Sequence, residues 1–228
     1  MEQIKYGEHE DQHIDIYHNE DQEKPNTWLI LIHGGYWRQK FSKSMLDTFL
    51  NALLHEGYSV VNVEYRRGTF EWPAPIEDVT SAIQAFKDSD FYHDETLISI
   101  GHSVGGQLAL LASNEVDRTI ALAPVTDVPY TKEHDLGDGA AEAYFKDAGD
   151  DVLKEASPIH QTPVQSETLI IHGFDDEKVH MATTLTYASK NLKDQNNITL
   201  YGYKLLPHLE CINPESFHMK DMLDWIQH

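Results

Sequence analysis

The residues best suited to chemistry in this 228-residue chain form the motif Gly101-His102-Ser103-Val104-Gly105. The motif follows a short apolar stretch, 96–100, and opens a stretch with helical spacing of apolar residues. A chain that turns sharply from a strand into a helix exposes the residue at the turn, and glycines are needed on either side because a Cβ would collide with backbone. The pattern therefore predicts that Ser103 is a nucleophile. The structural alternative is a serine within a glycine-rich phosphate-binding turn.

A serine hydroxyl is a weak nucleophile that needs a general base, and the base needs a group that orients it. After a serine motif of this kind the acid comes next along the chain and the histidine last. The turn His172-Gly173-Phe174-Asp175-Asp176 ends one predicted strand, and His208 follows the last predicted strand. We expect His208 to be the base and Asp176 the orienting acid, with Asp175 as the alternative acid.

A second glycine-rich turn, His33-Gly34-Gly35-Tyr36-Trp37, ends another apolar stretch. Preformed backbone N–H groups stabilise the oxyanion that forms when a nucleophile attacks a carbonyl. We expect one such N–H from Gly35 or Tyr36 and another from Val104, the residue after the predicted nucleophile. Substrate pockets are mostly apolar, so Tyr36 and Trp37 are also expected to bind substrate.

The segment His9-Glu10-Asp11-Gln12-His13 matches a zinc-binding signature, H-E-x-x-H. That signature binds zinc only on a helix, which places both histidines on one face. Here no apolar stripe accompanies the motif, and the chain continues into the alternating residues Ile14 and Ile16, which favour a strand. We therefore expect no metal and no cofactor.

Short apolar stretches alternate along the chain with stretches of helical spacing. Strands are predicted at 12–17, 27–33, 58–65, 96–100, 119–123, 167–172 and 198–205, and helices at 44–56, 76–86, 104–112, 180–191 and 214–226. This alternation predicts a doubly wound α/β domain with a mostly parallel sheet and helices on both faces. Residues 126–156, with nine acidic and three basic side chains, interrupt the order. We expect a helical insertion there that partly covers the edge of the sheet, either as a lid or as a solvated excursion.

Acidic side chains outnumber basic ones by 38 to 17, which gives a formal net charge of −21. This charge repels nucleic acids and anionic membranes, so we expect neither as a partner and a small-molecule substrate instead. No stretch approaches the ~20 apolar residues that span a bilayer, and the N-terminus lacks the apolar run of a signal peptide. The single cysteine, Cys211, fits a reducing compartment, so a cytoplasmic protein is expected. Oligomeric state and adaptation to salt are left open.

Taken together, these motifs resemble those of the α/β-hydrolase superfamily, and within it the kynurenine formamidases (arylformamidases) and related small carboxylesterases. The resemblance rests on the turn 33–37, the serine motif 101–106, the acid turn 172–176 and His208, together with Trp72-Pro73-Ala74-Pro75. It runs over nearly the whole chain. The serine motif is common to the superfamily, whereas H-G-G-Y-W is similar to the formamidase branch and occurs in its esterases too.

The resemblance implies one α/β-hydrolase domain over residues 1–228, with the insertion 126–156 as a possible lid. It also implies a serine hydrolase that forms an acyl-enzyme, an arylformamidase acting on N-formylkynurenine-like substrates being expected first. A short-chain carboxylesterase is the alternative. A prolyl-oligopeptidase-like peptidase is less expected, because no gating domain is present. A non-catalytic binding module on the same fold is a further alternative, but under it the presence of a complete serine, aspartate and histidine set would be a coincidence.

Overall fold

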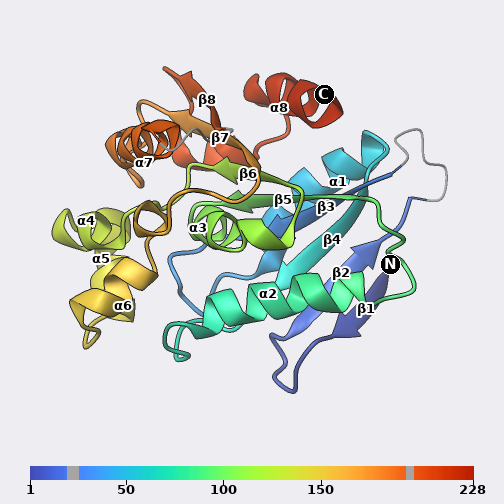
Figure 1. Ribbon diagram of the computed structural model, residues 1–228, viewed down its shortest axis with the longest axis horizontal. Coiled ribbons are helices and arrows are strands. Elements are labelled where there is room, and N and C mark those ends of the chain that lie inside the picture. The colour runs from blue at the N-terminus through green and yellow to red at the C-terminus, as the bar shows by residue number, and fades with distance from the viewer. Residues whose placement is uncertain (20–25, 194–197) are drawn as a thin grey trace.

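The computed structural model describes residues 1–19, 26–193 and 198–228, and a mostly parallel sheet runs through its centre (Figure 1). The strands are β1 (Glu2–Lys5), β2 (His13–Tyr17), β3 (Thr27–Ile32), β4 (Ser59–Glu64), β5 (Thr96–His102), β6 (Arg118–Leu122), β7 (Glu167–Gly173) and β8 (Ile198–Tyr203). They are ordered β1-β2-β4-β3-β5-β6-β7-β8. Strand β2 pairs in antiparallel fashion with both β1 and β4, and the remaining neighbours in this order, from β4 to β8, pair in parallel. The predicted fold class, that of the α/β-hydrolases, is confirmed; β1 was not predicted.

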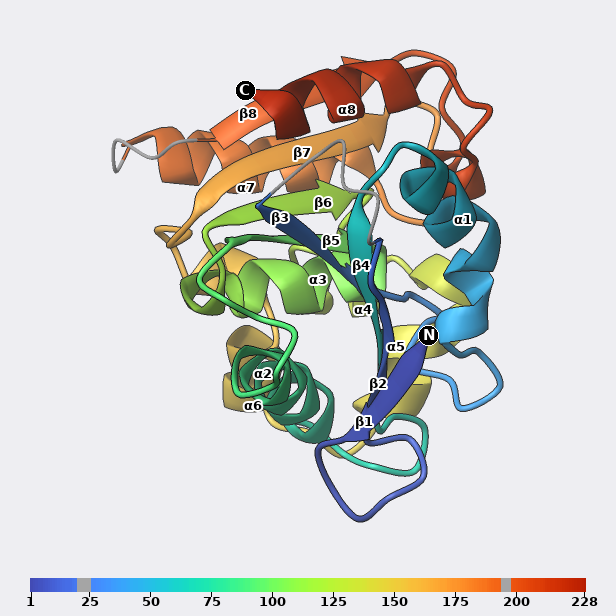
Figure 2. The same cartoon turned by 90° about the vertical axis from the view of Figure 1, so that its right-hand side faces the viewer.

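Helices cover both faces of this sheet (Figures 1 and 2). They are α1 (Asp47–His55), α2 (Ala74–Lys87), α3 (Val104–Leu111), α7 (Met181–Lys193) and α8 (His218–Gln227). Helices α1 and α8 lie on one face, and α2, α3 and α7 lie on the other. Within the described ranges, no helix combines the length and the apolar character needed to cross a membrane.

Burial on both faces explains why the central strands are continuous apolar stretches. In β3, Trp28, Ile30 and Ile32 pack into the cluster beneath α2 and α3, while Leu29 and Leu31 pack into the cluster beneath α1 and α8. Successive side chains of a strand point to opposite faces, so a strand covered on both faces needs an apolar residue at every position.

The last helix begins later than predicted. Its expected start was residue 214, whereas α8 begins at His218. The Asn213 side-chain oxygen accepts a hydrogen bond from Glu215 N at 3.0 Å, and Ser216 N donates to Asn213 O. Because an asparagine side chain that bonds its own backbone two residues on favours a turn, this turn replaces the first turn of the predicted helix.

The insertion 126–156 forms three helices, α4 (Val128–Glu133), α5 (Leu136–Tyr144) and α6 (Asp150–Glu155). Apolar residues along it, among them Ala140, Phe145 and Leu153, are buried in the same cluster as α2 and α3. The segment therefore packs against the body through one apolar face and is more than a solvated excursion.

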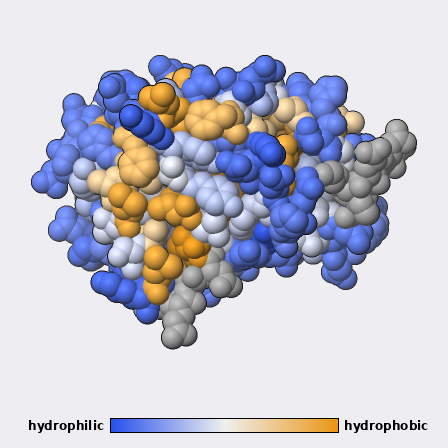
Figure 3. Space-filling model, turned by 90° about the horizontal axis from the view of Figure 1, so that it is seen from above, coloured by the Kyte–Doolittle hydropathy of each residue, from blue (hydrophilic) through white to orange (hydrophobic). Residues whose placement is uncertain are grey.

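Most of the surface seen from above is hydrophilic, as the net charge requires (Figure 3). Hydrophobic side chains gather on part of this face, toward the side of β7 and β8 (Figure 3). The exposed large apolar residues include Leu192 in α7, Leu205 just after β8 and Phe217 just before α8. Strand β8 lies at one edge of the sheet, and among the described strands it pairs with β7 alone.

Helix α3 packs closely, backbone against backbone, on the strands beneath it. A Cβ built on Gly105 would lie 2.0 Å from Ile32 O, and one built on Gly101 would lie 2.0 Å from Gly105 O. Both contacts involve rigid backbone, so α3 sits at this distance only because these positions are glycine.

We expect Gly105→Ala to lower the free energy of unfolding by about 1–3 kcal/mol or more, because the methyl group overlaps the Ile32 carbonyl and α3 must move outward. Urea denaturation followed by circular dichroism measures the change. Gly149→Ala is the matched control: its φ is −74°, and a Cβ there meets nothing within 4 Å. Unchanged stability of Gly105→Ala would contradict the close approach.

Candidate active site

Ser103 lies at the sharp turn between β5 and α3. Its φ of 58° and ψ of −116° are rare for a residue with a side chain. Residues at and just after the end of β6 stabilise this turn. Ser103 N donates to Leu122 O at 2.9 Å, and Val125 N donates to Ser103 O at 3.2 Å. Strained backbone of this kind persists only where the surroundings enforce it, and it is concentrated at functional sites.

Asp176 and His208 meet beside this turn. His208 Nδ1 lies 2.7 Å from Asp176 Oδ2, and both side chains are nearly fully buried. The other carboxylate oxygen of Asp176 accepts hydrogen bonds from Lys178 N and Val179 N at 2.8 and 2.9 Å. Asp175, in contrast, is exposed and accepts a hydrogen bond from Leu206 N. Of the two candidate acids, the structure brings Asp176 to His208.

A buried histidine supports this carboxylate from behind. His172 Nε2 lies 3.3 Å from Asp176 Oδ2 and 2.9 Å from Val179 O, while Thr184 Oγ1 lies 2.8 Å from His172 Nδ1. Burial raises the pKa of Asp176, but the hydrogen bonds from His172 and His208 outweigh it and hold that pKa well below its usual range. Asp176 is therefore an ionised carboxylate that accepts hydrogen bonds at both oxygens.

His102, which the sequence analysis did not single out, also positions His208. Its Nε2 donates to His208 O at 3.0 Å, and the two rings lie 4.6 Å apart. Burial, followed by the nearby His208, lowers the pKa of His102 to about 3, so its ring is neutral. The motif pattern offers no signal for this role, because it leaves the residue before the serine unspecified.

The second glycine turn approaches the serine closely. A Cβ built on Gly34 would lie 2.8 Å from His102 O and 3.1 Å from Ser103 Cβ. Gly35 has a φ of +118° and Tyr36 a φ of 57°. Within the described chain, no acceptor takes the backbone N–H of Gly35, Tyr36 or Val104. Buried N–H groups are nearly always paired, so these three are suited to bind a ligand oxygen.

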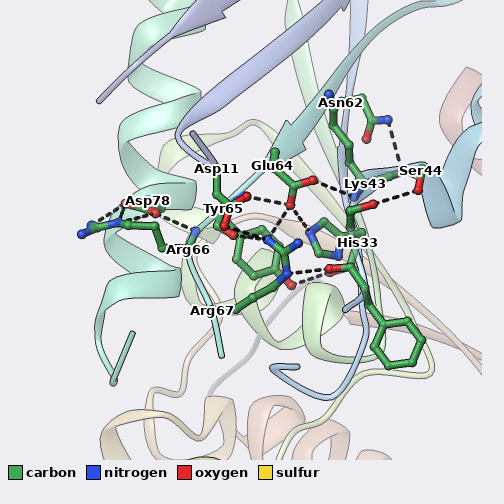
Figure 4. Close-up of polar contacts among 12 residues, drawn as sticks. Asp11, His33, Lys43, Ser44, Asn62, Glu64, Tyr65, Arg66, Arg67 and Asp78 are labelled. Atoms are coloured by element: carbon green, nitrogen blue, oxygen red, sulfur yellow. Dashed lines mark hydrogen bonds and ion pairs between the residues drawn. The ribbon is translucent and has the colours of Figure 1, made fainter. Parts of the chain in front are cut away.

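A buried ionic network fixes the chain that carries this turn (Figure 4). Glu64 Oε1 lies 2.9 Å from His33 Nε2 and 2.6 Å from Arg67 Nη1, and Glu64 Oε2 accepts from Lys43 N at 3.1 Å. Arg67 Nε donates to Phe41 O at 2.6 Å. Burial raises the pKa of Glu64, but His33 and Arg67 outweigh it and keep that pKa below its ordinary value. The network thus holds both ends of the segment 33–43 through one ionised carboxylate.

These elements enclose a small pocket with a cavity of about 160 Å³. Its reactive wall is formed by Ser103, His102 and His208. The remaining wall is mostly apolar and comes from Gly35, Tyr36, Phe41, Met45 and Leu209, with Lys178 at its side. Phe41, Met45, Lys178 and Leu209 were not expected, because none of these positions belongs to a motif.

Trp37 does not line this pocket, so its expected role in substrate binding is wrong. Its side chain is 2% exposed and stacks on Tyr144 at 5.8 Å between ring centroids. Trp37 Nε1 donates to Gln107 Oε1 at 3.1 Å. The ring is held in the core beneath α5, because the insertion and α3 offer it an apolar site with a partner for its N–H. Tyr36 alone of the two reaches the pocket.

The H-E-x-x-H segment lies in a turn and a strand. His9 belongs to the turn between β1 and β2, and His13 opens β2. His13 Nε2 lies 2.9 Å from Lys43 Nζ, beside a cation. In residues 1–19, 26–193 and 198–228, no group of three or more His, Cys, Asp or Glu side chains could hold a metal ion. The two histidines of the signature therefore do not share a helical face.

The sheet order and the meeting of Ser103, Asp176 and His208 define the class of protein, the α/β-hydrolases. The family model BD-FAE matches residues 14–135, more than half of the chain, and the chain belongs to that family.

Solved structures share the fold at low sequence identity. A "truncated form of carbohydrate esterase from gut microbiota" is 20% identical with a TM-score of 0.85, over 98% of this chain and 93% of that one. An acetyl ester-xyloside bifunctional hydrolase from Caldicellulosiruptor lactoaceticus is 17% identical with a TM-score of 0.82, over 99% and 93%. A hormone-sensitive lipase from a metagenome library is 17% identical with a TM-score of 0.74, over 89% and 78%.

The neutral His102 predicts a pH dependence of stability. Its pKa of about 3 in the folded protein lies below the ordinary value of 6.5, so between these values the unfolded chain binds more protons. Stability must then fall as pH decreases, by about 1.4 kcal/mol per pH unit. We expect wild type to lose about 2 kcal/mol more than His102→Gln between about pH 6 and pH 4.5.

Urea denaturation of both proteins across this pH range measures the difference. His102→Gln keeps an N–H donor for the carbonyl of His208 but cannot titrate. Parallel pH curves for the two proteins would contradict the prediction.

Proposed function

We propose that this chain is a serine hydrolase of the carboxylesterase type, with Ser103 as nucleophile, His208 as general base and Asp176 as the acid that orients it. The observation that carries the proposal is the 2.7 Å contact between His208 Nδ1 and Asp176 Oδ2, next to a serine held at a strained turn in the same pocket. Membership of the BD-FAE family and the shared fold support hydrolysis of esters.

In this mechanism Ser103 Oγ attacks the substrate carbonyl while His208 takes its proton. Asp176 accepts the Nδ1–H of His208, which fixes the ring tautomer and stabilises the imidazolium. The N–H groups of Gly35 or Tyr36 and of Val104 bind the oxyanion. The carbonyl–leaving-group bond then breaks as His208 returns the proton to the leaving group. Water, activated by His208, cleaves the acyl-enzyme and restores Ser103.

The size of the pocket supports a short acyl group. Its cavity of about 160 Å³ is below the range of about 300–1,000 Å³ of pockets for drug-sized ligands. Neighbours described as a carbohydrate esterase and an acetyl ester-xyloside hydrolase support a short-chain ester as the leading substrate. A formyl amide such as N-formylkynurenine is the second candidate, favoured by the H-G-G-Y-W turn and by the small size of a formyl group.

The two adjacent aspartates provide a matched pair of variants. We expect Asp176→Asn to lower kcat about 10³–10⁴-fold, because an amide at this position no longer stabilises the protonated His208 and favours the wrong tautomer. Asp175→Asn keeps an oxygen acceptor for Leu206 N and should stay close to wild type. Steady-state kinetics on one short-chain ester measures both. Loss of activity in Asp175→Asn but not in Asp176→Asn would refute the assignment.

The substrate class is tested by comparing N-formylkynurenine with p-nitrophenyl acetate and p-nitrophenyl butyrate. We expect the acetate to be hydrolysed with the higher kcat/KM of the two esters, because the cavity is small, and Ser103→Ala to be inactive. A clearly higher kcat/KM for the formyl amide would select an arylformamidase instead.

Covalent labelling with a fluorophosphonate probe completes this test. We expect an adduct on Ser103 in wild type and none in Ser103→Ala. Wild-type activity in Ser103→Ala would refute the mechanism. Absence of both labelling and turnover would favour a non-catalytic binding module.

A further inference from the structure

Lys178 is a charged group beside the pocket that the mechanism does not use. Among the described residues lining the pocket, it is the one lysine or arginine. It follows Asp176 by two residues, and its backbone N–H donates to Asp176 Oδ1 at 2.8 Å. The turn that holds the acid for His208 therefore also fixes the backbone of Lys178, whose side chain lines the pocket while its ammonium lies near the exposed Asp138.

Two further cations, which do not line the pocket themselves, lie over aromatic rings that do. The Arg38 guanidinium lies 5.5 Å from the centre of the Tyr36 ring, and Lys40 Nζ lies 5.0 Å from the centre of the Phe41 ring. Basic side chains are the minority in this chain, 17 against 38 acidic ones. Lys178 lines the pocket, and Arg38 and Lys40 add positive charge behind two of its aromatic residues.

The counter-ion of Lys178 is weakly held. Asp138 Oδ2 lies 3.9 Å from Lys178 Nζ, and the two side chains are 78% and 46% exposed. The backbone of Asp138 is fixed independently, because Arg38 donates to the carbonyl oxygens of Gly137 and Asp138 at 3.2 and 2.8 Å. An exposed pair at this distance contributes little, so an anion of the substrate can replace Asp138 at little cost.

We propose that Lys178 forms an anion subsite and that this enzyme prefers esters carrying a carboxylate close to the scissile bond. The inference rests on the proposed function and names its substrate class. A protein of net charge −21 repels an anionic substrate at long range. Lys178, with Arg38 and Lys40 over neighbouring rings, counters this repulsion locally, and its ammonium exchanges Asp138 for the substrate carboxylate.

Two pairs of esters test the subsite, one with the charge on the acyl group and one with the charge on the leaving group. The pairs are mono-(4-nitrophenyl) glutarate with 4-nitrophenyl butyrate, and 4-acetoxybenzoate with phenyl acetate. The measured quantity is the ratio of kcat/KM for the anionic ester to that for its neutral partner. The intrinsic reactivity of each ester is the same for every variant, so a difference in this ratio between variants reports only on the protein.

We expect Lys178→Met to lower the ratio about five-fold for at least one pair, mainly through KM, as loss of a partly exposed ion pair implies. Lys178→Glu should lower it further, and Asp138→Asn should raise it because the competing carboxylate is gone. Lys146→Met is the matched control: it removes one positive charge from a 70% exposed side chain that does not line this pocket, and should leave the ratio unchanged.

Salt supplies an independent readout. Raising NaCl from about 0.02 M to about 0.5 M should lower the ratio in wild type but not in Lys178→Met, because screening acts on the charge that the variant lacks. Equal ratios in wild type and Lys178→Met for both pairs would overturn the subsite. If wild type hydrolyses none of the four esters, the proposed function fails instead, so the two failures are distinguishable.

Discussion

The close approach of α3 to β3 and β5 is the constraint on which the rest of the site depends. Gly105 lets the helix backbone rest on the Ile32 carbonyl, and Gly101 gives the same freedom on the strand side. Between them the chain has no room for a gradual turn, so Ser103 takes a left-handed conformation. The same packing brings Gly34 against Ser103 Cβ, and with it the turn of Gly35 and Tyr36, whose N–H groups have no acceptor among the described residues. The positions of the proposed nucleophile and of the proposed oxyanion donors therefore both follow from one backbone contact.

Buried carboxylates fix the loops on either side of that contact. Glu64, ionised by His33 and Arg67, ties down the segment that carries Gly35 and Tyr36. Asp176, ionised by His172 and His208, ties down the turn after β7. A buried charge is tolerated only when it is paired and hydrogen-bonded, so each carboxylate makes its loop adopt one arrangement. The loops that carry the proposed catalytic groups are therefore fixed by paired charges. Lys178 and Asp138, in contrast, form an exposed pair in which the proposed substrate carboxylate would replace the Asp138 carboxylate.

The sequence by itself determined seven of the strands, the order of elements along the chain and the position of Ser103 at a strand-to-helix turn. Strands buried on both faces have an apolar residue at nearly every position, and helices covering them have apolar residues at helical spacing, so local periodicity predicts both. The glycines on either side of Ser103 predicted a sharp turn, because part of the backbone contact that requires them lies within the turn itself. His208 was predictable as well, since few loops follow the last strand. Strand β1 escaped prediction because four mostly exposed residues carry too short a pattern.

Only the tertiary structure decided which side chains meet. Asp175 and Asp176 have the same chemistry and are adjacent, and only the path of the chain from 206 to 208 brings His208 to one and Leu206 N to the other. Tyr36 and Trp37 are likewise adjacent, yet Trp37 turns into the core because the distant insertion offers it a partner in Tyr144. Lys178 gains its place beside the pocket from loops far apart in the sequence. The pattern of apolar residues within a helix or strand determines which of its side chains are buried. The direction of a loop side chain depends instead on contacts with segments distant in the sequence, which no local pattern describes.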